Sequence, residues 1–190
     1  PGKVAAVVTH LDMTERPRLR AAPELPTLSL RKEARMAPAA YRALFRAVGG
    51  QSWLWCSRLM MSDAALSEIL WDDRVDLCIL EQAGAPVGLL ELDFREPDAC
   101  ELAFLGLVPT LVGQGAGRYL INIGISRAWS RPSSRLHVHT CTFDHPDALA
   151  FYIRSGFTPR RRQIEVMDDP RLTGVLDRDA APHIPVIPDI

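Results

Sequence analysis

The sequence has almost no net charge, no long apolar run and no secretion signal. Its 22 lysines and arginines nearly balance its 23 aspartates and glutamates, which leaves a formal net charge of -1. A nearly neutral chain has no general attraction to nucleic acid or to an anionic membrane, so we expect neither as a partner. No apolar run reaches the 18 residues of a membrane-spanning helix, and the N-terminus lacks the apolar stretch of a signal peptide. We therefore predict a cytoplasmic protein.

Cysteine is scarce and is not spaced for metal or redox chemistry. The four cysteines are Cys56, Cys78, Cys100 and Cys141, and no two of them form a C-x-x-C pair. This spacing excludes a zinc ribbon and a thioredoxin-like site. Cys78 and Cys100 lie in apolar runs, where a thiol behaves as a small hydrophobic group. We expect reduced thiols, as is usual in the cytoplasm.

Three common catalytic or nucleotide-binding motifs are also absent. A Walker loop needs a Gly-Lys-Ser/Thr sequence, and none occurs. A nucleophile elbow needs G-x-S-x-G, whereas Ser126, Ser130 and Ser133 lie outside any such sequence. A dinucleotide fingerprint needs G-x-G-x-x-G at the start of a parallel βαβ unit. The glycines of residues 113–117 are spaced too tightly for that fingerprint, and the strands before them are predicted to form a meander.

What the sequence does contain predicts one domain with a substantial core. The chain has 190 residues, 47% of them hydrophobic, and this length suffices to bury a core without metals or disulfides. We divide the single domain into an N-terminal strand and linker (1–27), a core (28–167) and a proline-containing tail (168–190). The apolar side chains near the end of the tail favour docking onto a surface over disorder.

Hydrophobic periodicity predicts an α/β (α+β) fold, with a mixed, mostly antiparallel central sheet and helices on both faces. Tyr41, Leu44, Phe45 and Val48 follow helical spacing, and the pair Gly49-Gly50 is expected to end that helix. Strands are expected at residues 4–13, 28–33, 75–81, 87–94, 100–108, 135–142 and 157–167, and helices at 37–48, 62–71 (with Ser62 as N-cap), 117–129 and 146–154.

A glycine-rich loop, Gly113-Gln114-Gly115-Ala116-Gly117, joins a predicted strand to a predicted helix. The first turn of a helix leaves backbone N–H groups unpaired, and the helix dipole adds partial positive charge there. Glycines let these amides approach a phosphate without a Cβ clash, so a diphosphate is the expected guest. The alternative interpretation is a glycine turn that only leads into a core helix.

Two stretches of the sequence resemble one enzyme family. Residues 101–109 followed by Gly113-x-Gly115-x-Gly117 resemble motif A of the GCN5-related N-acetyltransferase (GNAT) family. The later Ala148-x-x-x-Tyr152-x-x-x-Gly156-Phe157 resembles motif B, and the resemblance spans residues 28–167. Two positions depart from the family pattern: Val112 stands where a Gln or Arg is usual, and His145 stands where an Asn is frequent.

The resemblance implies an N-acetyltransferase that transfers the acetyl group of acetyl-CoA to a primary amine of a small molecule or a protein by direct attack. The alternative is a module that binds CoA or acyl-CoA, such as a sensor, without transferring the acyl group. The sequence leaves open the acceptor and whether the chain forms a homodimer. The residues implied in cofactor binding are Leu107, Val108, Val112, Gly113, Gln114, Gly115, Ala116, Gly117 and Arg118.

Acetyl transfer needs a base, a polarised carbonyl and a proton donor for the thiolate. Glu101 is the preferred base, because its spacing to the loop glycines resembles that of the family's base glutamate; Glu91 is the second choice. The carbonyl would be polarised by the backbone N–H of Leu107 or Val108 at a bulge beside Gly106. Tyr152 occupies the family's tyrosine place and is the candidate general acid.

Other residue patterns carry weaker hypotheses. His137-x-His139 would place two imidazoles on one strand face, but we see no third ligand and predict no metal site. His139 or His145 is a candidate for the acceptor side of the site. Cys141 beside His139 would permit a ping-pong thiol acyl transfer, which is unusual in the family that the chain resembles.

Two further regions are candidates for contact with the acceptor substrate. Trp53 and Trp55 follow the first helix and would either line the acceptor pocket or pack in the core. The run Arg160-Arg161-Arg162 is expected to be a solvated sheet edge, with contact to an acidic acceptor as the alternative.

Overall fold

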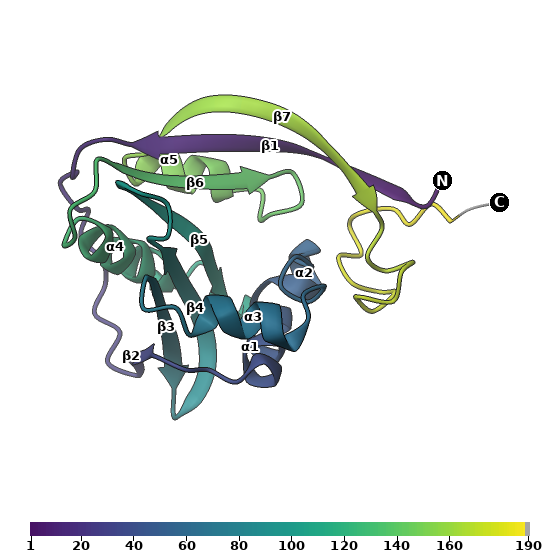
Figure 1. The fold of residues 1–190 in the computed structure, drawn as a ribbon, viewed down its shortest axis with the longest axis horizontal. Helices are drawn as coiled ribbons and strands as arrows, with labels where there is room; N and C mark the ends of the chain where they lie inside the picture. Colours follow the sequence, from purple (N-terminus) through teal and green to yellow (C-terminus); the bar gives the residue numbers. More distant parts are fainter. Residues whose placement is uncertain (189–190) are drawn as a thin grey trace.

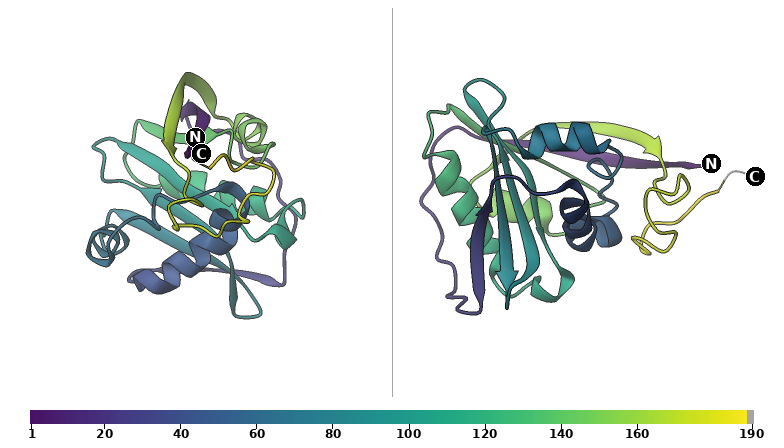
Figure 2. Two further views of the ribbon diagram at one scale, coloured as in Figure 1. Left: turned by 90° about the vertical axis from the view of Figure 1, so that its right-hand side faces the viewer. Right: turned by 60° about the horizontal axis from the view of Figure 1, so that its bottom comes forward.

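The computed structural model describes residues 1–188, which form a seven-stranded sheet with helices on both faces (Figures 1 and 2). The predicted fold class is confirmed. The elements in chain order are β1 (Lys3–Met13), β2 (Leu28–Glu33), α1 (Pro38–Phe45), the π-helical turn η1 (Arg46–Gly50), α2 (Gln51–Trp53), α3 (Asp63–Leu70), β3 (Val75–Gln82), β4 (Ala85–Asp93), β5 (Ala99–Leu107), the 3₁₀ turn η2 (Pro109–Leu111), α4 (Ala116–Ala128), β6 (Arg135–Cys141), α5 (Ala148–Arg154) and β7 (Thr158–Asp168). Among these described residues, no helix has both the length and the apolar character needed to cross a membrane.

The strand order in the sheet is β2-β3-β4-β5-β6-β1-β7. Strands β2 to β5 pair in an antiparallel manner, and the short turns of residues 75–108 predict this meander for β3 to β5. The N-terminal strand β1 inserts between β6 and β7 and is antiparallel to both, with Val8 opposite Cys141 and Lys3 opposite Asp168. Figure 1 shows β1 and β7 as a long ribbon that extends beyond the rest of the sheet.

β5 and β6 form the one parallel pair among the strand pairings of the described residues, and they diverge after three residues. Ala99, Cys100 and Glu101 lie opposite residues 135–137, and no register pair follows. The paired ends anchor the strands, so the sheet splits beyond Glu101 while remaining continuous elsewhere. This split determines where a ligand can enter the fold.

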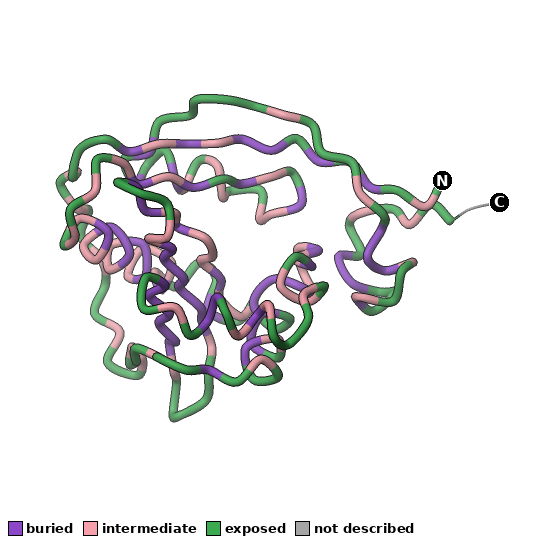
Figure 3. The backbone as a smooth tube through the Cα atoms, viewed as in Figure 1, coloured by how far each residue is buried: buried purple, intermediate pink, exposed green. Residues whose placement is uncertain are grey.

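The two faces of the sheet carry separate hydrophobic cores. β3 is buried on both faces and alternates between them with the two-residue period of a strand: Cys78 and Leu80 face α4, whereas Leu77 and Ile79 face α1 and α3. Most of the buried positions in Figure 3 lie in these two layers. The helices therefore hold β3, β4 and β5 rigidly on both sides.

The first helix differs from the sequence prediction. Gly49 and Gly50 do not end it; a π-helical turn passes through them, and the helical path ends at Leu54, whose φ is 56°. A Cβ on Gly49 would lie 2.1 Å from the Trp55 indole, so glycine is required here for close packing. The next prediction holds: the Ser62 hydroxyl accepts a hydrogen bond from the Ala65 N–H (3.2 Å) and caps α3.

The tail after β7 docks onto the domain beside α2. The Ala181 N–H donates to the Gln51 carbonyl (2.8 Å), and Leu176 packs with Leu54 in a third small core. The buried Arg171 guanidinium forms an ion pair with the equally buried Asp169 and donates to four tail carbonyls, so it organises the whole segment (2.7 Å between Nη2 and Oδ2).

Candidate active site

A cavity of about 620 Å³ fills the split between β5 and β6. Its lining includes the loop glycines Gly113, Gly115 and Gly117 as well as Trp53 and Trp55. The volume is in the range of small-molecule sites. The sequence motifs named above therefore meet around one space, although β5, α4, β6 and α5 contribute them separately.

The glycine loop presents free amides to this cavity. Gly113 and Gly115 have φ of 80° and 87°, and Gly115 is the N-cap of α4. The first four N–H groups of a helix, here those of residues 115–118, have no intrahelical acceptor. Two other loop amides are already engaged, since Val112 donates to the Pro109 carbonyl and Gln114 to the Leu111 carbonyl (3.2 and 3.3 Å).

Not every implied cofactor residue reaches the cavity. Leu107, Val112, Gly113, Gly115, Gly117 and Arg118 line it. Val108, Gln114 and Ala116 do not line it; Gln114 is exposed and its side-chain amide donates to the Thr110 carbonyl (2.6 Å), whereas Ala116 is buried in the core. Val112 is 42% exposed and contributes an apolar surface at the cavity mouth.

Three arginines gather near the loop. Burial lowers the pKa of Arg118, and the charges of Arg20 and Arg154 lower it further. Arg20 belongs to the linker, which lies along α4 because the Asn122 side chain donates to the Arg20 carbonyl (2.7 Å). Mutually repelling cations at a helix N-terminus favour a polyanionic guest. The sequence identified Arg118; Arg20 carries no local signal, because only the path of the linker places it here.

The backbone of β5 differs from the expectation at one point. The bulge lies at Ala103, because Glu91 is opposite Phe104 while Leu92 is opposite Leu102. Gly106, where the bulge was predicted, is in regular register, and its missing side chain instead makes room for Val48, 2.7 Å from where a Cβ would lie.

The regular register settles which amide near Gly106 is free. The Val108 N–H donates to the Val87 carbonyl (3.0 Å), so it is not free to polarise a bound carbonyl. Successive residues of a strand point their N–H groups to opposite edges, which directs the Leu107 N–H into the split. Leu107, not Val108, therefore offers a donor to the cavity.

Glu91 is unavailable as a base. Its carboxylate is fully buried and accepts hydrogen bonds from the Tyr41 hydroxyl and the Arg58 guanidinium, both at 2.5 Å. Burial, together with the charge of Glu91, raises the pKa of Tyr41 well above its ordinary value. Glu91 thus belongs to a closed network that anchors α1 and the loop at Arg58 to β4.

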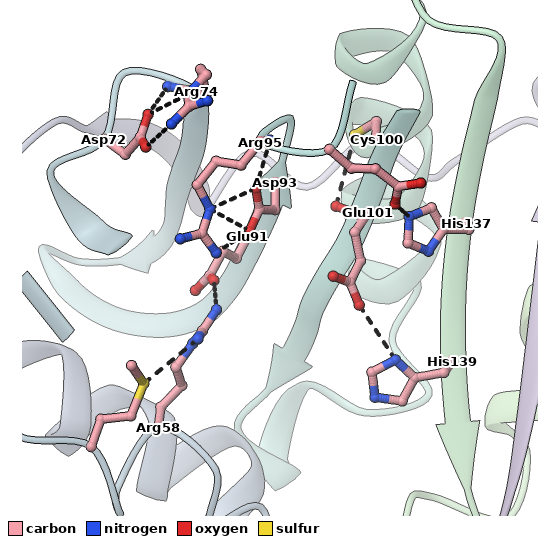
Figure 4. Close-up of polar contacts among 12 residues, drawn as sticks. Arg58, Asp72, Arg74, Glu91, Asp93, Arg95, Cys100, Glu101, His137 and His139 are labelled. Carbon is pink, nitrogen blue, oxygen red and sulfur yellow. Dashed lines mark hydrogen bonds and ion pairs between the residues drawn. The ribbon is translucent and has the colours of Figure 1, made fainter. Parts of the chain in front are cut away.

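Glu101 lies at the point where β5 and β6 part, and it points toward β6 (Figure 4). Its Oε1 is 3.4 Å from Nδ1 of His139. The contact with His139 lowers the pKa of Glu101, and the same contact raises the pKa of His139. His139 lines the cavity, whereas Glu101 lies beside it.

Tyr152 lines the cavity from α5 and is almost fully buried. Burial and the nearby charge of Asp144 raise the pKa of its phenol, so the hydroxyl stays protonated at neutral pH. Asp144 also accepts hydrogen bonds from the Trp55 indole (2.8 Å) and the Thr140 hydroxyl (2.7 Å). This carboxylate therefore joins the two walls of the cavity.

The structure does not support Cys141 as a nucleophile or the two strand histidines as metal ligands. Burial and Asp144 raise the pKa of the Cys141 thiol to about 11, which leaves little thiolate for a ping-pong reaction. His137 and His139 pair with different carboxylates; Nε2 of His137 is 3.2 Å from Glu96. Within residues 1–188, no group of three or more metal-binding side chains comes together.

With this geometry established, the chain is assigned by comparison: it belongs to the acetyltransferase (GNAT) family, whose sequence profile matches residues 47–157, more than half of the chain. Among individual proteins, it is similar to a mycothiol acetyltransferase from Jonesia denitrificans, 36% identical over 64 residues, which are 34% of this chain and 20% of that protein.

Solved structures share the fold at low sequence identity. A putative GNAT-family acetyltransferase from Novosphingobium aromaticivorans has a TM-score of 0.58 and 16% identity, covering 87% of this chain and 66% of that one. A GCN5-related N-acetyltransferase from Sphaerobacter thermophilus has a TM-score of 0.59 and 13% identity, covering 86% and 51%. The chain thus spans about half to two thirds of the length of these solved proteins.

Proposed function

We propose that this chain is an N-acetyltransferase that transfers the acetyl group of acetyl-CoA to a primary amine of a small molecule or a protein. One observation carries the proposal: a single cavity connects the free amides of the glycine loop with the Leu107 N–H, Tyr152 and the Glu101–His139 pair. Phosphate donors at one end and proton-transfer groups in the middle are what this reaction needs.

The glycine loop would bind the phosphates of acetyl-CoA. The free amides of residues 115–118 and the dipole of α4 would hold the diphosphate. Arg20, Arg118 and Arg154 would neutralise the remaining negative charge. The thiol-bearing arm would then follow the open edge of β5 into the split, because that edge offers unpaired backbone groups.

The transfer step follows from the groups around the split. The amine nitrogen attacks the thioester carbonyl carbon, and the Leu107 N–H stabilises the charge that develops on the carbonyl oxygen. The C–S bond breaks, and the departing CoA thiolate takes a proton from the Tyr152 hydroxyl. The amine loses its proton toward the Glu101 side of the cavity, where the negative charge of Glu101 favours proton uptake. The products are the acetylated amine and CoA.

A thermal-shift titration with acetyl-CoA and CoA, with ATP as control, tests the binding claim. A ligand at 100 times its Kd adds about 2.7 kcal/mol to the free energy of unfolding. Release of free thiol with a panel of primary amines then tests transfer. Stabilisation without thiol release would identify a coenzyme-binding module, and the absence of stabilisation would refute both functions.

A further inference from the structure

We infer that His139 takes the proton from the attacking amine, and that Glu101 is a positioning residue that acts through His139. This inference rests on the proposed function and deepens it, because it names the proton acceptor of the same site. The family resemblance points to Glu101 alone. The geometry separates the two residues.

Position in the cavity favours His139. Its side chain lines the cavity and is 52% exposed, whereas the Glu101 side chain is 33% exposed and lies outside the lining. Figure 4 shows that Nδ1 of His139 faces Glu101 while the second ring nitrogen points away from it. An acceptor amine in the cavity therefore meets the imidazole before it meets the carboxylate.

The Glu101 contact fixes the chemistry of the imidazole. A carboxylate beside Nδ1 favours the tautomer with its hydrogen on Nδ1, which leaves the lone pair on Nε2. When Nε2 takes a proton, the same carboxylate stabilises the imidazolium that forms. Glu101 thus orients His139 and raises its proton affinity without touching the acceptor.

The charges that face His139 come from every neighbouring element. Glu101 on β5, Asp144 after β6 and Glu165 on β7 all raise its pKa above the ordinary 6.5, against the effect of burial. His10 on β1 has its ring centroid 5.9 Å away. Burial, Arg161 and His139 itself lower the pKa of His10, which disfavours a second positive charge beside His139.

These environments match His139 to the task better than Glu101. A general base is most effective when its pKa lies near the working pH. Glu101 has a pKa below 4.5, held down by His139, which makes its carboxylate a weak base at neutral pH. The contact with Glu101 raises the pKa of His139 above its ordinary value, which makes the imidazole a stronger base than an isolated histidine.

The strand also supplies a matched control. His137 lies two residues earlier on β6 and also contacts a carboxylate, with Nε2 3.2 Å from Glu96. His137 does not line the cavity. A variant at this position therefore removes an imidazole–carboxylate contact of the same kind from the same strand without changing the cavity lining.

The experiment measures kcat/KM against pH for the best amine of the panel, with wild type, His139→Gln, His137→Gln and Glu101→Gln. We expect His139→Gln to lower kcat/KM by about a hundredfold or more. The ratio of wild type to His139→Gln, in which the titration of the amine cancels, should rise with pH through a value above 6.5. Glu101→Gln should shift that rise to lower pH, because the charge that raises the pKa of His139 is gone. His137→Gln should change neither quantity.

Two results would overturn the inference. Either His139→Gln keeps most of the activity, or Glu101→Gln costs more than His139→Gln while the ratio of wild type to His139→Gln stops changing above pH 5. An acetyl-CoA thermal shift retained by each variant shows that it is folded and still binds cofactor. A wild type that releases no thiol with any amine would instead refute the proposed function, which is a distinguishable failure.

Discussion

At the scale of single residues, two glycines of the loop share a positive φ angle but have different surroundings. Gly113 and Gly115 both have positive φ, which costs an L-residue about 1–2 kcal/mol. A Cβ on Gly113 would meet open space, whereas a Cβ on Gly115 would lie 2.3 Å from Pro23 of the linker. Gly115 is therefore required both for its backbone conformation and for packing. Because it has no side chain, the linker that carries Arg20 can lie against the N-terminus of α4.

We therefore predict that Gly115→Ala is clearly more harmful than Gly113→Ala. Both variants should lose about 1–2 kcal/mol of unfolding free energy to the backbone strain. Gly115→Ala should lose more and should also bind acetyl-CoA at least tenfold more weakly, because it displaces the linker. Urea denaturation and a thermal-shift titration measure the two effects. Equal losses would show that the Pro23 contact is unimportant.

A second residue-scale prediction concerns Tyr152. Tyr152→Phe removes the proton donor for the thiolate and keeps the ring that packs in the core, so kcat should fall about tenfold or more. The acetyl-CoA thermal shift should persist. Tyr119→Phe on α4, which lies outside the cavity lining, is the control. An unchanged kcat for Tyr152→Phe would remove this hydroxyl from the mechanism.

Sequence patterns identified the loop glycines and Tyr152 because their spacings are local. They ranked Glu101 above Glu91 only because its spacing to the loop glycines resembles that of the family's base glutamate. The choice depends on contacts across the fold: Tyr41 and Arg58 close off Glu91, and His139 meets Glu101. For His139 the sequence suggested only a place on the acceptor side, because nothing in its strand shows which carboxylate it faces.

At the scale of elements, most helices and strands were predictable from periodicity and caps, and the exceptions have physical causes. Gly49-Gly50 failed to end the first helix because tertiary packing against Trp55 outweighs the low helix propensity of glycine. The bulge in β5 was predicted beside Gly106 and lies at Ala103, where the residue type gives no indication of a bulge. In the first case a contact with Trp55 decided the local geometry.

The tail provides the element-scale prediction. Arg171 and Asp169 form a fully buried ion pair, and removing one partner of such a pair costs about 3–5 kcal/mol. Arg171→Met should destabilise the protein by that order, whereas Arg178→Met on the exposed part of the tail should have little effect. Thermal and urea unfolding measure both variants. A loss below about 1 kcal/mol would show that the tail is not held by this pair.

The stability lost in Arg171→Met should depend on pH, because the ion pair contains a titratable carboxylate. The contact with Arg171 lowers the pKa of Asp169, so its stabilisation is present above the unfolded carboxyl's pKa and is lost as the pH falls through the folded one. The difference between wild type and Arg171→Met should therefore shrink in acid. Unfolding measured at neutral pH and at pH about 3 makes this comparison.

At the scale of the whole molecule, the fold class followed from the alternation of apolar residues, but the order of strands did not. Nothing in residues 3–13 indicates that this strand lies between β6 and β7. The split between β5 and β6, which creates the cavity, is equally invisible in the sequence, because it depends on where pairing stops. The sequence motifs of the candidate site could therefore be predicted, but the cavity that they surround could not.

The position of β1 has a consequence for biosynthesis. Both of its neighbours follow it at a large distance in sequence: β1 ends at Met13, and β6 begins only at Arg135. On the ribosome this strand therefore emerges long before either of its partners. Pairings between segments so distant in sequence form slowly, because a large loop must close first. The meander from β2 to β5 has only nearby partners and is therefore available to fold first, with β1 joining the sheet last.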